Sequence, residues 1–379
     1  MRFLCIVGTR PEAIKMAPLT LELKRHASVA CVCSGQHIDL AREPLDWFGI
    51  PVDEQLDIGS THKSLSGLTA AMLPALEAAI ARHRPDIVVA QGDTTTVFVA
   101  ALASFYLGVP FAHLEAGLRT GNLQAPFPEE FNRVAAGRLA AWHFCPTERA
   151  RENLIREGLA VDRMFVTGNT GIDALRLTLE RLNVGDEPQG GERVILLTAH
   201  RRENHGAPLV AIARAVRDIV VEFPDVSFVI PVHPNPAVRQ SLFDQLGSTP
   251  RVALVPPLGY RQLVEAMARA TLILTDSGGI QEEAPFLGKP VLVMRDVTER
   301  PEAVDLGVAK LVGTDADTLV GATRRLLTDA DAYARMAGGG SPYGDGYAAQ
   351  RIAAAFGLGS IDSRSQRAPS AREDKVGTA

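Results

Sequence analysis

Short runs of Val, Ile and Leu alternate along this chain with longer segments rich in Ala, Leu and Arg. The short runs have the composition of buried strands, and the longer segments have the spacing of amphipathic helices. This alternation is typical of parallel α/β proteins, in which helices connect successive strands. In the first half, strands are expected at 2–8, 29–35, 86–92, 110–116, 142–146 and 164–169. In the second half, they are expected at 194–200, 226–233, 252–257, 272–277, 290–294 and 309–313.

A polar segment from Asn183 to Gly191 separates the two sets of strands and is typical of a loop or linker. We therefore expect an α/β fold of two Rossmann-like domains with a central cleft, at residues 1–172 and 173–358. A chain of 379 residues is long enough for two such cores. A Gly-rich stretch at 338–346 precedes the last predicted helix, which is a candidate to pack back on the N-terminal domain. Residues 359–379 are polar and are expected to be disordered.

Composition and charge exclude several classes of protein. The net charge of −5 argues against a nucleic-acid partner held by bulk charge. The apolar runs fall short of the roughly 18 residues needed to span a bilayer, so no membrane partner is expected. The apolar run near Met1 is followed by charge and is interpreted as the first strand rather than a signal segment. The four cysteines lack zinc spacing and are expected to be buried thiols in a reducing cytoplasm.

Polar residues of unusual kind follow the predicted strands in both halves of the chain. Open α/β sheets bind ligands outside the carboxyl ends of their strands, so this placement predicts one shared cleft. In chain order, these residues are Arg10, Lys15, Asp93, His113, Glu115, His200, Arg201, His233 and Asp276.

The segment after the predicted strand 272–277 has the features of a phosphate site. Ser277, Gly278 and Gly279 are expected to form a turn, and 280–288 a short helix. Backbone N–H groups at such a helix start point outward, with the positive end of the helix dipole behind them. Arg300 can supply a fixed cation. A bound diphosphate, as in a nucleotide-sugar, is the first inference.

Two further cations flank the Gly-Thr turn after the first predicted strand. Arg10 and Lys15 could form a solvated helix face, but their position next to that turn favours contact with phosphate.

Carboxylates are the candidates for acid/base chemistry. Asp93 precedes a predicted helix and could serve only as its N-cap. Glu115 lies inside an apolar run, which favours a functional role over a buried ion pair with Arg119. Glu129 lies in the first turn of a predicted helix, where a carboxylate favours the helix dipole without needing another purpose. His200 begins a basic run, and its place at a strand end favours a leaving-group or phosphate role over a surface patch.

Taken together, Asp93, Glu115 and Glu129 indicate proton transfer. The chain has no Cys/His cluster at ligand spacing and no Asp-x-Asp motif at these strand ends, so no metal is expected.

These segments resemble the bacterial non-hydrolysing UDP-N-acetylglucosamine 2-epimerases. The resemblance implies a GT-B-like fold, a homodimer, and reversible conversion of UDP-GlcNAc to UDP-ManNAc without a cofactor. It also implies elimination of UDP to 2-acetamidoglucal, then re-addition, supplying ManNAc units for cell-surface polysaccharide. The matching segments run in family order over most of the chain and are GTRPEAIKMAPL (8–19), SGQH (34–37), QGDTTTVFVAAL (91–102), HLEAGLRTG (113–121), FPEEFNR (127–133), HFCPTERARENL (143–154), VTGNTGIDAL (166–175), TAHRREN (198–204), PVHPNP (231–236), LTDSGGIQEEAPFLGKPVLVMRDVTERPEA (274–303) and SPYGDG (341–346).

The resemblance also assigns roles by position. Asp93, Glu115 and Glu129 match the acid/base carboxylates, without fixing which serves which face of the sugar. Glu283 matches a ribose-contacting carboxylate, and a helix-surface charge is its alternative. A second, activating UDP-GlcNAc is contacted in the family at positions that match Gln36, His37, Arg201 and His233.

The chemistry agrees with these residues on independent grounds. The C2 hydrogen of the sugar is not adjacent to a carbonyl, so early breakage of the C1–O bond is needed to acidify it. Preorganised donors can stabilise the departing UDP oxyanion by roughly 3–4 kcal/mol each. The candidate donors are Arg10, Lys15, His200, Arg300 and the Ser277–Gly279 backbone. A hydrolysing 2-epimerase, a GT-B glycosyltransferase and a nucleotide-sugar sensor are the alternatives.

Overall fold

The computed structural model describes residues 1–35, 38–58, 64–182, 193–201 and 204–359. They form two compact units. Unit 1 contains Met1–Leu177 and the segment that begins at Tyr343, and unit 2 contains Thr178–Pro342. The chain leaves unit 1 within α7 (Thr170–Leu182) and re-enters it at Tyr343. The predicted linker at 183–191 and the predicted tail, apart from residue 359, lie outside the described residues.

Unit 1 is built on a parallel sheet, which in the described residues has the strand order β3-β2-β1-β4-β5-β6-β7. The predicted strands are present, and one further strand, β3, was missed because it has only two residues and no apolar run. The bounds are β1 (Arg2–Val7), β2 (Ser28–Cys33), β3 (Glu54–Gln55), β4 (Ile87–Gln91), β5 (Phe111–Leu114), β6 (Trp142–Cys145) and β7 (Met164–Val166).

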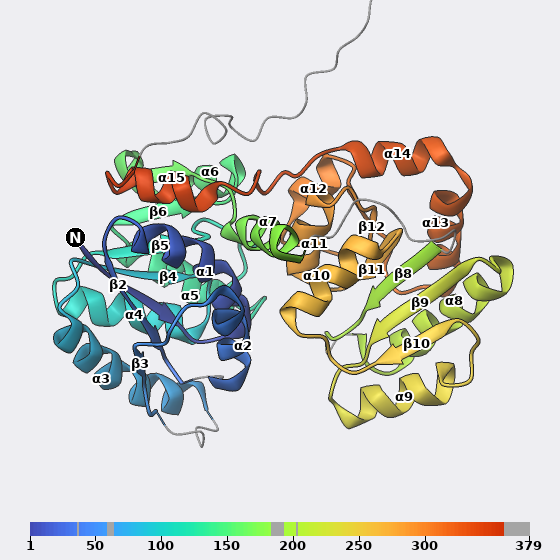
Figure 1. Cartoon of the computed structure of the whole chain (residues 1–379), viewed down its shortest axis with the longest axis horizontal. Coiled ribbons are helices and arrows are strands. Elements are labelled where there is room, and N and C mark those ends of the chain that lie inside the picture. Colours follow the sequence, from blue (N-terminus) through green and yellow to red (C-terminus); the bar gives the residue numbers. More distant parts are fainter. Residues whose placement is uncertain (36–37, 59–63, 183–192, 202–203, 360–379) are drawn as a thin grey trace, which may run out of the picture. The chain divides into compact units, whose positions relative to one another are not determined.

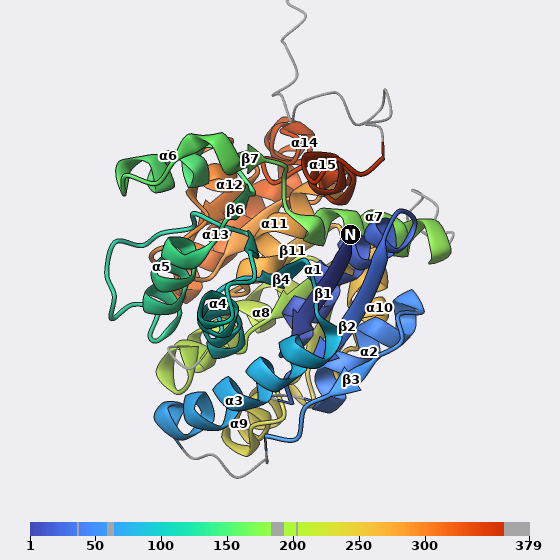
Figure 2. The same ribbon diagram turned by 90° about the vertical axis from the view of Figure 1, so that its left-hand side faces the viewer.

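Helices cover this sheet, as Figures 1 and 2 show. α3 packs against α4, which packs against α5, while α1 contacts α2 and α15. The bounds are α1 (Arg10–Lys24), α2 (Ile38–Phe48), α3 (Leu65–His83), α4 (Thr95–Tyr106), α5 (Glu129–Leu139), α6 (Glu148–Arg156) and α15 (Ala348–Ala355), with a 3-10 turn at Val161–Arg163.

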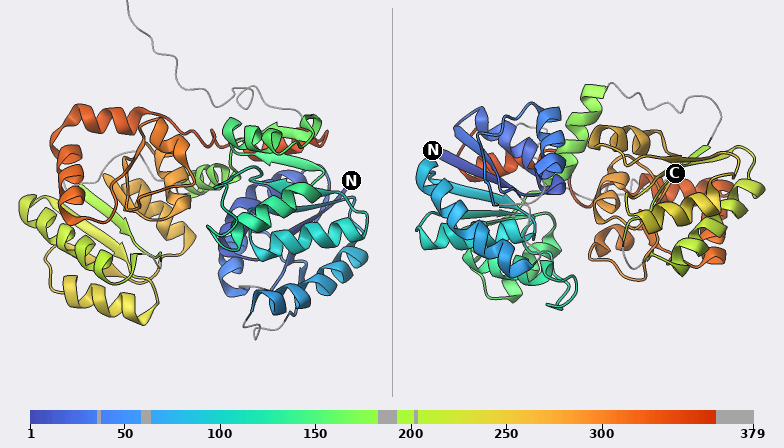
Figure 3. Two further views of the ribbon diagram at one scale, coloured as in Figure 1. Left: turned by 180° about the vertical axis from the view of Figure 1, so that it is seen from behind. Right: turned by 90° about the horizontal axis from the view of Figure 1, so that it is seen from below.

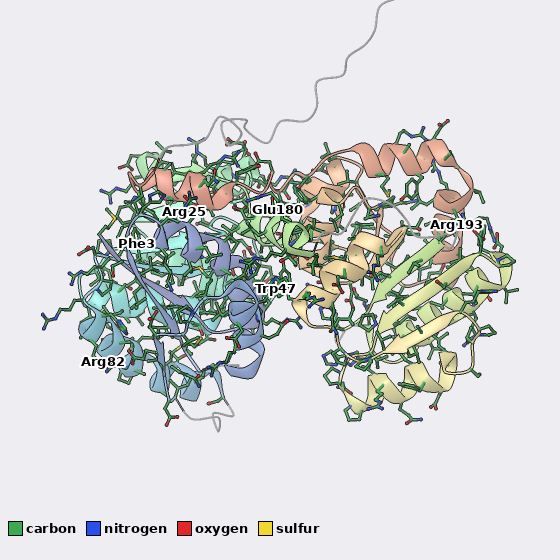
Figure 4. All side chains as sticks on the ribbon, in the orientation of Figure 1. Phe3, Arg25, Trp47, Arg82, Glu180 and Arg193 are labelled. Atoms are coloured by element: carbon green, nitrogen blue, oxygen red, sulfur yellow. The ribbon has the colours of Figure 1, made fainter. Side chains whose placement is uncertain are left out.

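The last helix, α15, belongs to unit 1. Phe356, just after it, meets an aromatic cluster on the sheet, with ring centroids 5.1 Å from Phe3, 5.6 Å from Trp142 and 5.2 Å from Phe144. Phe3 is labelled in Figure 4. Aromatic burial of this kind anchors a helix that is distant in sequence from the strands it covers.

Unit 2 repeats the architecture with the strand order β10-β9-β8-β11-β12-β13, again all parallel. Figure 3 shows helices around its strands in two further views. Its strands are β8 (Arg193–Thr198), β9 (Val226–Pro231), β10 (Val252–Val255), β11 (Leu272–Thr275), β12 (Val291–Val293) and β13 (Ala309–Leu311). Its helices are α8 (Ala207–Glu222), α9 (Pro236–Leu246), α10 (Tyr260–Arg269), α11 (Gly278–Phe286), α12 (Pro301–Asp305), α13 (Ala316–Thr328) and α14 (Ala330–Gly338). The α/β class with two Rossmann-like, GT-B-like sheets is confirmed.

One local prediction is wrong. Gly278 and Gly279 do not belong to a turn before the helix, because α11 already begins at Gly278, with Ser277 as its N-cap residue. Strand β11 correspondingly ends at Thr275. Glycine is a weak helix former, but the first turn of a helix tolerates it because that turn has few intrahelical hydrogen bonds to lose.

The strand order positions the candidate residues within each unit. In each sheet the order of the strands reverses beside the first strand of the unit, between β1 and β4 and between β8 and β11. Loops that leave two such strands diverge to opposite faces and open a crevice at the switch point. The residues after these four strands are therefore those best placed to meet a ligand.

The cysteines behave as ordinary buried thiols. Cys5, Cys31, Cys33 and Cys145 are buried and form no disulfide. Burial raises the pKa of Cys5 and Cys33 to about 11 and that of Cys145 to about 12. Such thiols are poor nucleophiles. Among the described helices, none combines the length and apolar character that crossing a bilayer would need.

Candidate active site

The turn after β1 is built around a buried carboxylate, Glu12. Thr9 is the N-cap residue of α1, and Glu12 accepts hydrogen bonds from the N–H groups of Gly8 and Thr9 and from the Thr94 hydroxyl. Burial raises the pKa of Glu12 to about 7, although these bonds oppose the rise. Gly8 admits no side chain, because a Cβ there would lie 2.2 Å from Thr96 Oγ1. Glu12 thus ties the end of β1 to the start of α4.

Glu115 follows β5 and has a left-handed backbone, with φ of 61°. A residue with a side chain rarely adopts this conformation, which costs of order 1–3 kcal/mol and clusters at functional sites. Its side chain is only 7% exposed. Oε2 accepts hydrogen bonds from Lys15 Nζ, from Gln91 Nε2 at 2.9 Å and from Asn169 Nδ2 at 2.9 Å. Donors converging on one oxygen stabilise the ionised carboxylate.

The alternative that Glu115 pairs with Arg119 is wrong. Arg119 instead binds Glu157 through Nε at 2.6 Å and Nη2 at 3.0 Å. The cation beside Glu115 is Lys15, so the structure places Lys15 on a carboxylate of unit 1. Arg10 lies nearby at the start of α1, with Nε 3.7 Å from Glu43 Oε2.

Asp93 follows β4 and is crowded by other carboxylates. Burial is the main cause that raises its pKa to about 6, and the charges of Glu115 and Glu129 add to the rise. Arg133 opposes it, with Nη2 3.0 Å from Asp93 Oδ2, and so does Lys15. The three carboxylates predicted for acid/base work are therefore close enough to interact through their charges.

Asp93 is not a helix cap. The N-cap residue of α4 is Thr94, whose Oγ1 accepts the N–H of Val97 at 3.4 Å. The interpretation of Asp93 as an N-cap alone is therefore wrong. The Asp93 carbonyl accepts a hydrogen bond from Asn132 Nδ2 at 2.9 Å, and His113 binds the preceding carbonyl, that of Gly92, at 2.7 Å. These contacts hold the backbone of the turn.

The neighbouring acids Glu129 and Glu130 have different surroundings. Glu130 is 1% exposed, and its Oε1 accepts the N–H groups of Thr120 and Gly121, each at 2.9 Å. It therefore holds the loop that precedes α5. Glu129, the first residue of α5, is half-buried, and its charge contributes to the raised pKa of Asp93.

In unit 2, Asp276 directly follows β11 and is fully buried, and its N–H donates to the carbonyl of Thr198 at the end of β8. Its Oδ2 accepts the N–H groups of His200 and Arg201 and the Asn204 amide, each at 2.9 Å. Its Oδ1 lies 3.0 Å from Nδ1 of His200, whose side chain is 47% exposed. Burial opposes ionisation of Asp276, but the His200 contact and these donors outweigh it and lower its pKa. His200 is thus oriented through one ring nitrogen.

The N-terminus of α11 lies against Arg300. A Cβ on Gly278 would lie 2.5 Å from Arg300 Nη1, so the guanidinium covers that glycine. Arg300 also binds Glu282 through Nε and Glu299 through Nη1, the latter at 2.6 Å. Ser277, Gly278 and Gly279 are half-buried. This helix start and the guanidinium offer the donors that a diphosphate needs.

Arginines surround Glu299 in the same unit. Burial opposes its ionisation, but the charges of Arg300, Arg295 and Arg201 lower its pKa to about 2. Arg201 Nη2 lies 3.3 Å from Glu299, and Arg295 Nη1 lies 2.9 Å from it. Glu299 thus holds the guanidinium groups of Arg201, Arg295 and Arg300 in fixed positions.

The remaining predicted residues lie in varied places. Glu283 is 9% exposed on α11, so the alternative of a helix-surface charge is wrong. His233 follows β9, and its Nδ1 accepts the N–H of Asn235 at 3.2 Å. Burial and the nearby His200 and His205 lower the pKa of His233. Gln36 and His37 lie outside the described residues.

Several residues that build the site escaped the sequence analysis. Gln91 and Asn169 donate to Glu115, Arg133 pairs with Asp93, and Glu12 supports the first turn. The usable signal was an amide at or shortly past the end of an apolar strand, as at Gln91, the last residue of β4, and Asn169, three residues after β7. Within the described part of the chain, no group of His, Cys, Asp and Glu side chains is arranged to hold a metal ion.

Comparison with known proteins places the chain among relatives along almost its whole length. A family profile described as UDP-N-acetylglucosamine 2-epimerase matches residues 20–357. The UDP-N-acetylglucosamine 2-epimerase of Bacillus subtilis is 47% identical over 357 residues, which cover 93% of this chain and 94% of that protein.

Solved structures agree. The crystal structure of UDP-GlcNAc 2-epimerase from Neisseria meningitidis bound to UDP-GlcNAc has a TM-score of 0.88 and 43% identity, covering 94% of this chain and 99% of that one. The enzyme from Methanocaldococcus jannaschii, in complex with UDP-GlcNAc and UDP, has a TM-score of 0.80 and 32% identity, covering 94% and 99%.

Proposed function

Because the chain belongs to the UDP-N-acetylglucosamine 2-epimerase family of isomerases, we propose that it interconverts UDP-N-acetylglucosamine and UDP-N-acetylmannosamine by eliminating and re-adding UDP. One observation carries the proposal: Asp93, just after β4 at the switch point of unit 1, lies close enough to Glu115 and Glu129 for their charges to interact. The binding of UDP-GlcNAc by the relative from Neisseria meningitidis supports the choice of substrate.

The reaction needs a base and a leaving group at adjacent carbons. A carboxylate of unit 1 removes the C2 proton, and the C2–H electron pair forms the C1=C2 double bond of 2-acetamidoglucal. The C1–O bond breaks, and its electron pair leaves with UDP. UDP oxygen then adds back to C1 while a second group delivers a proton to the other face of C2. Two faces of one carbon require at least two acid/base groups.

The carboxylates of unit 1 suit these roles because their environments differ. Glu115 accepts hydrogen bonds from Lys15, Gln91 and Asn169 on one oxygen, while the pKa of Asp93, raised to about 6, lies close to neutral pH. Groups whose environments separate their protonation can act as base and acid in turn. We assign Asp93, Glu115 and Glu129 to this work without dividing the two faces of C2 among them.

Unit 2 supplies the groups that hold the leaving diphosphate. The first N–H groups of α11, at Gly278 and Gly279, and the Arg300 guanidinium fit phosphate oxygens, while the N–H of the N-cap residue Ser277 donates to Thr275 Oγ1 at 2.9 Å. His200 is held by Asp276 through Nδ1, which leaves Nε2 to face a departing oxygen. Arg10 and Lys15 are the corresponding cations of unit 1, and Glu283 is the proposed ribose contact.

Finer assignments extend the same proposal. A homodimer acting in the cytoplasm and supplying ManNAc units for cell-surface polysaccharide agrees with the family resemblance. Gln36, His37, Arg201 and His233 are proposed to contact a second, activating UDP-GlcNAc. The buried, unpaired cysteines are compatible with a reducing compartment.

The test is to incubate the purified chain with UDP-GlcNAc alone in heavy water and follow the anomeric and C2 protons by NMR. We expect a mixture with a minority of UDP-ManNAc, deuterium at C2, and only traces of free UDP. Stoichiometric free ManNAc would instead identify a hydrolysing enzyme, and an unchanged spectrum a transferase or sensor. Epimer without deuterium at C2 would refute the elimination step.

A further inference from the structure

We propose that Asn169 is a positioning residue for Glu115, and that the segment by which the chain re-enters unit 1 holds Asn169 in place. The inference rests on the proposed acid/base role of Glu115. Asn169 lies between β7 and α7, 54 residues from Glu115 in sequence, and is 3% exposed. A buried amide at this place is costly unless both its ends are used.

The oxygen of the Asn169 amide accepts a hydrogen bond, and its nitrogen donates one. Its Oδ1 accepts the N–H of Gly171 at 3.0 Å, as an N-cap side chain does at the first turn of α7. Its Nδ2 donates to Glu115 Oε2 at 2.9 Å. Since the oxygen is occupied by an N–H group, the NH₂ end must face the carboxylate. Asp or Ser could serve the cap, but neither could donate to Glu115 in the same geometry.

Glu115 depends on such donors more than an ordinary glutamate does. Its left-handed backbone, with φ of 61°, aims the side chain inward, where only 7% of it is exposed. The donors to Oε2 come from α1, from the end of β4 and from the start of α7, through Lys15, Gln91 and Asn169. Together they fix the direction of the oxygen from different sides. Loss of Asn169 removes the support that comes from α7.

The backbone around Asn169 is held by the re-entering segment. The N–H of Asn169 donates to the carbonyl of Tyr343 at 2.7 Å, and Tyr343 is 1% exposed. The two segments approach each other at glycines. A Cβ on Gly168 would lie 3.1 Å from Gly344 Cα, and a Cβ on Gly344 would lie 3.3 Å from Gly168 Cα. Both glycines have positive φ, 87° and 132°. Side chains at either position would separate the two segments.

A second clamp lies one helical turn further on. Asp173 accepts the N–H groups of Ala348 and Ala349 at 3.1 and 2.8 Å, at the start of α15. The re-entering segment is thus bound on both sides of the turn that presents Asn169. The segment is therefore connected to a proposed catalytic carboxylate through one amide.

The experiment compares Asn169→Asp with Asn169→Ser. Both variants keep an oxygen that can cap α7, so Asn169→Ser should melt within a few degrees of the wild type. Asn169→Asp should melt lower, because it buries a second carboxylate against Glu115, and we expect its kcat to fall by about 100-fold or more. Ser only removes the donor, and we expect a fall of roughly 10-fold. KM should change by no more than about 3-fold, because Asn169 itself is not proposed to contact the diphosphate.

The pH profile separates positioning from general damage. The acidic limb of kcat should move to higher pH in Asn169→Asp, because a second carboxylate favours the protonated form of Glu115. Asn169→Ser should move it less in the same direction. Asn235→Asp, the same change at the N-cap of α9 in unit 2, is the control and should leave the profile in place. Turnover of Asn169→Asp within about 3-fold of the wild type, or equal losses in both variants without a pH shift, would overturn the inference.

Gly344→Ala tests the hold of the re-entering segment. We expect a loss of kcat comparable to that of Asn169→Ser, and a double variant no worse than the poorer single one, because both act through the same amide. Fully additive losses would show that the segment does not work through Asn169.

A readout without turnover distinguishes this inference from the proposed function. In protein labelled with ¹³C at glutamate carboxyls, the Glu115 resonance can be assigned by its absence from Glu115→Gln. Its titration should move upward in Asn169→Asp whether or not the wild type epimerises UDP-GlcNAc. An unmoved resonance would overturn the inference, whereas a silent wild type in the isotope assay would overturn only the proposed function.

Discussion

The two units share a strand order around their switch points, but the pKa values of several of their carboxylates shift in opposite directions. In unit 1, burial raises the pKa of Glu12 and Asp173 to about 7 and that of Asp93 to about 6. In unit 2, burial acts in the same direction, yet neighbouring donors and cations outweigh it. They lower the pKa of Asp276, and they lower that of Glu299 to about 2.

The difference comes from how many cations lie close to the carboxylates of each unit. In unit 1, Asp93, Glu115 and Glu129 share the nearby charges of Lys15 and Arg133. In unit 2, by contrast, Arg201, Arg295 and Arg300 all lie close to Glu299, and Arg300 also binds Glu282. One fold can thus keep groups that exchange protons near neutral pH in one unit and fixed charges that suit an anion in the other.

The largest expected effect separates reaction from binding. Glu115→Gln keeps the shape of the side chain but cannot take up a proton, so we expect kcat to fall by about 1,000-fold. UDP should bind to this variant within a few-fold of the wild-type affinity, because Glu115 itself is not proposed to contact the diphosphate and the amide oxygen of Gln can still accept from Lys15. Steady-state kinetics and calorimetric titration with UDP measure the two quantities. Glu152→Gln, an exposed change on α6, is the control.

A near-normal rate for Glu115→Gln would remove Glu115 from the reaction. A large loss of UDP affinity in the same variant would break the proposed division of labour between the units.

A smaller effect is expected in unit 2. Asp276→Asn can keep an oxygen toward Arg201 and Asn204, but its NH₂ end then faces His200 Nδ1. The imidazole must then accept at Nδ1, and it loses the carboxylate charge that would stabilise an imidazolium donating from Nε2 to the departing oxygen. We expect kcat to fall roughly 10- to 100-fold. Nitrogen NMR of labelled histidine should show the exchange of tautomers.

Asp244→Asn on α9 serves as the control for that change, because Asp244 binds only Gln240 among the contacts shown. An unchanged tautomer together with lost activity would mean that Asp276 acts by supporting the turn alone.

The smallest effect concerns stability, and the two units should differ in their dependence on pH. The pKa of Asp93 is raised, so its contribution to stability is present below the ordinary value of 3.8 and is lost as pH rises through about 6. Asp93→Asn should therefore gain stability relative to the wild type between pH 4 and pH 7, by roughly 1–2 kcal/mol. Thermal melts at several pH values measure this gain.

Asp276 has a lowered pKa, so its stabilisation is already complete above 3.8. Asp276→Asn should be less stable than the wild type by an amount that stays constant over the same interval. A matching rise in both variants would show that the two units do not differ in this respect.

The chain pattern predicted most of the fold and the neighbourhood of the site. Runs of branched apolar residues identified the strands, since a strand buried on both faces has few other compositions available. The two-residue strand β3 gave no such signal, and the glycines at 278 and 279 suggested a turn where α11 begins. The candidate acids were found because carboxylates are rare directly after apolar strands.

The partners of those acids were beyond reach of the sequence. Lys15 and Glu115 are separated by 100 residues, and Asn169 and Glu115 by 54. Periodicity tells which face of an element a residue occupies, but not which distant element meets that face. Arg119 was a plausible partner for Glu115 by proximity, and the structure pairs it with Glu157.

By itself, the sequence determined the class of fold, the strands and the chemical type of each site residue, because these depend on local composition and periodicity. Tertiary structure alone decided which carboxylates share charge, which are satisfied by donors, and therefore where each proton resides. Those properties depend on burial and on distances between segments far apart in the chain, and free energies of ionisation respond to just these quantities.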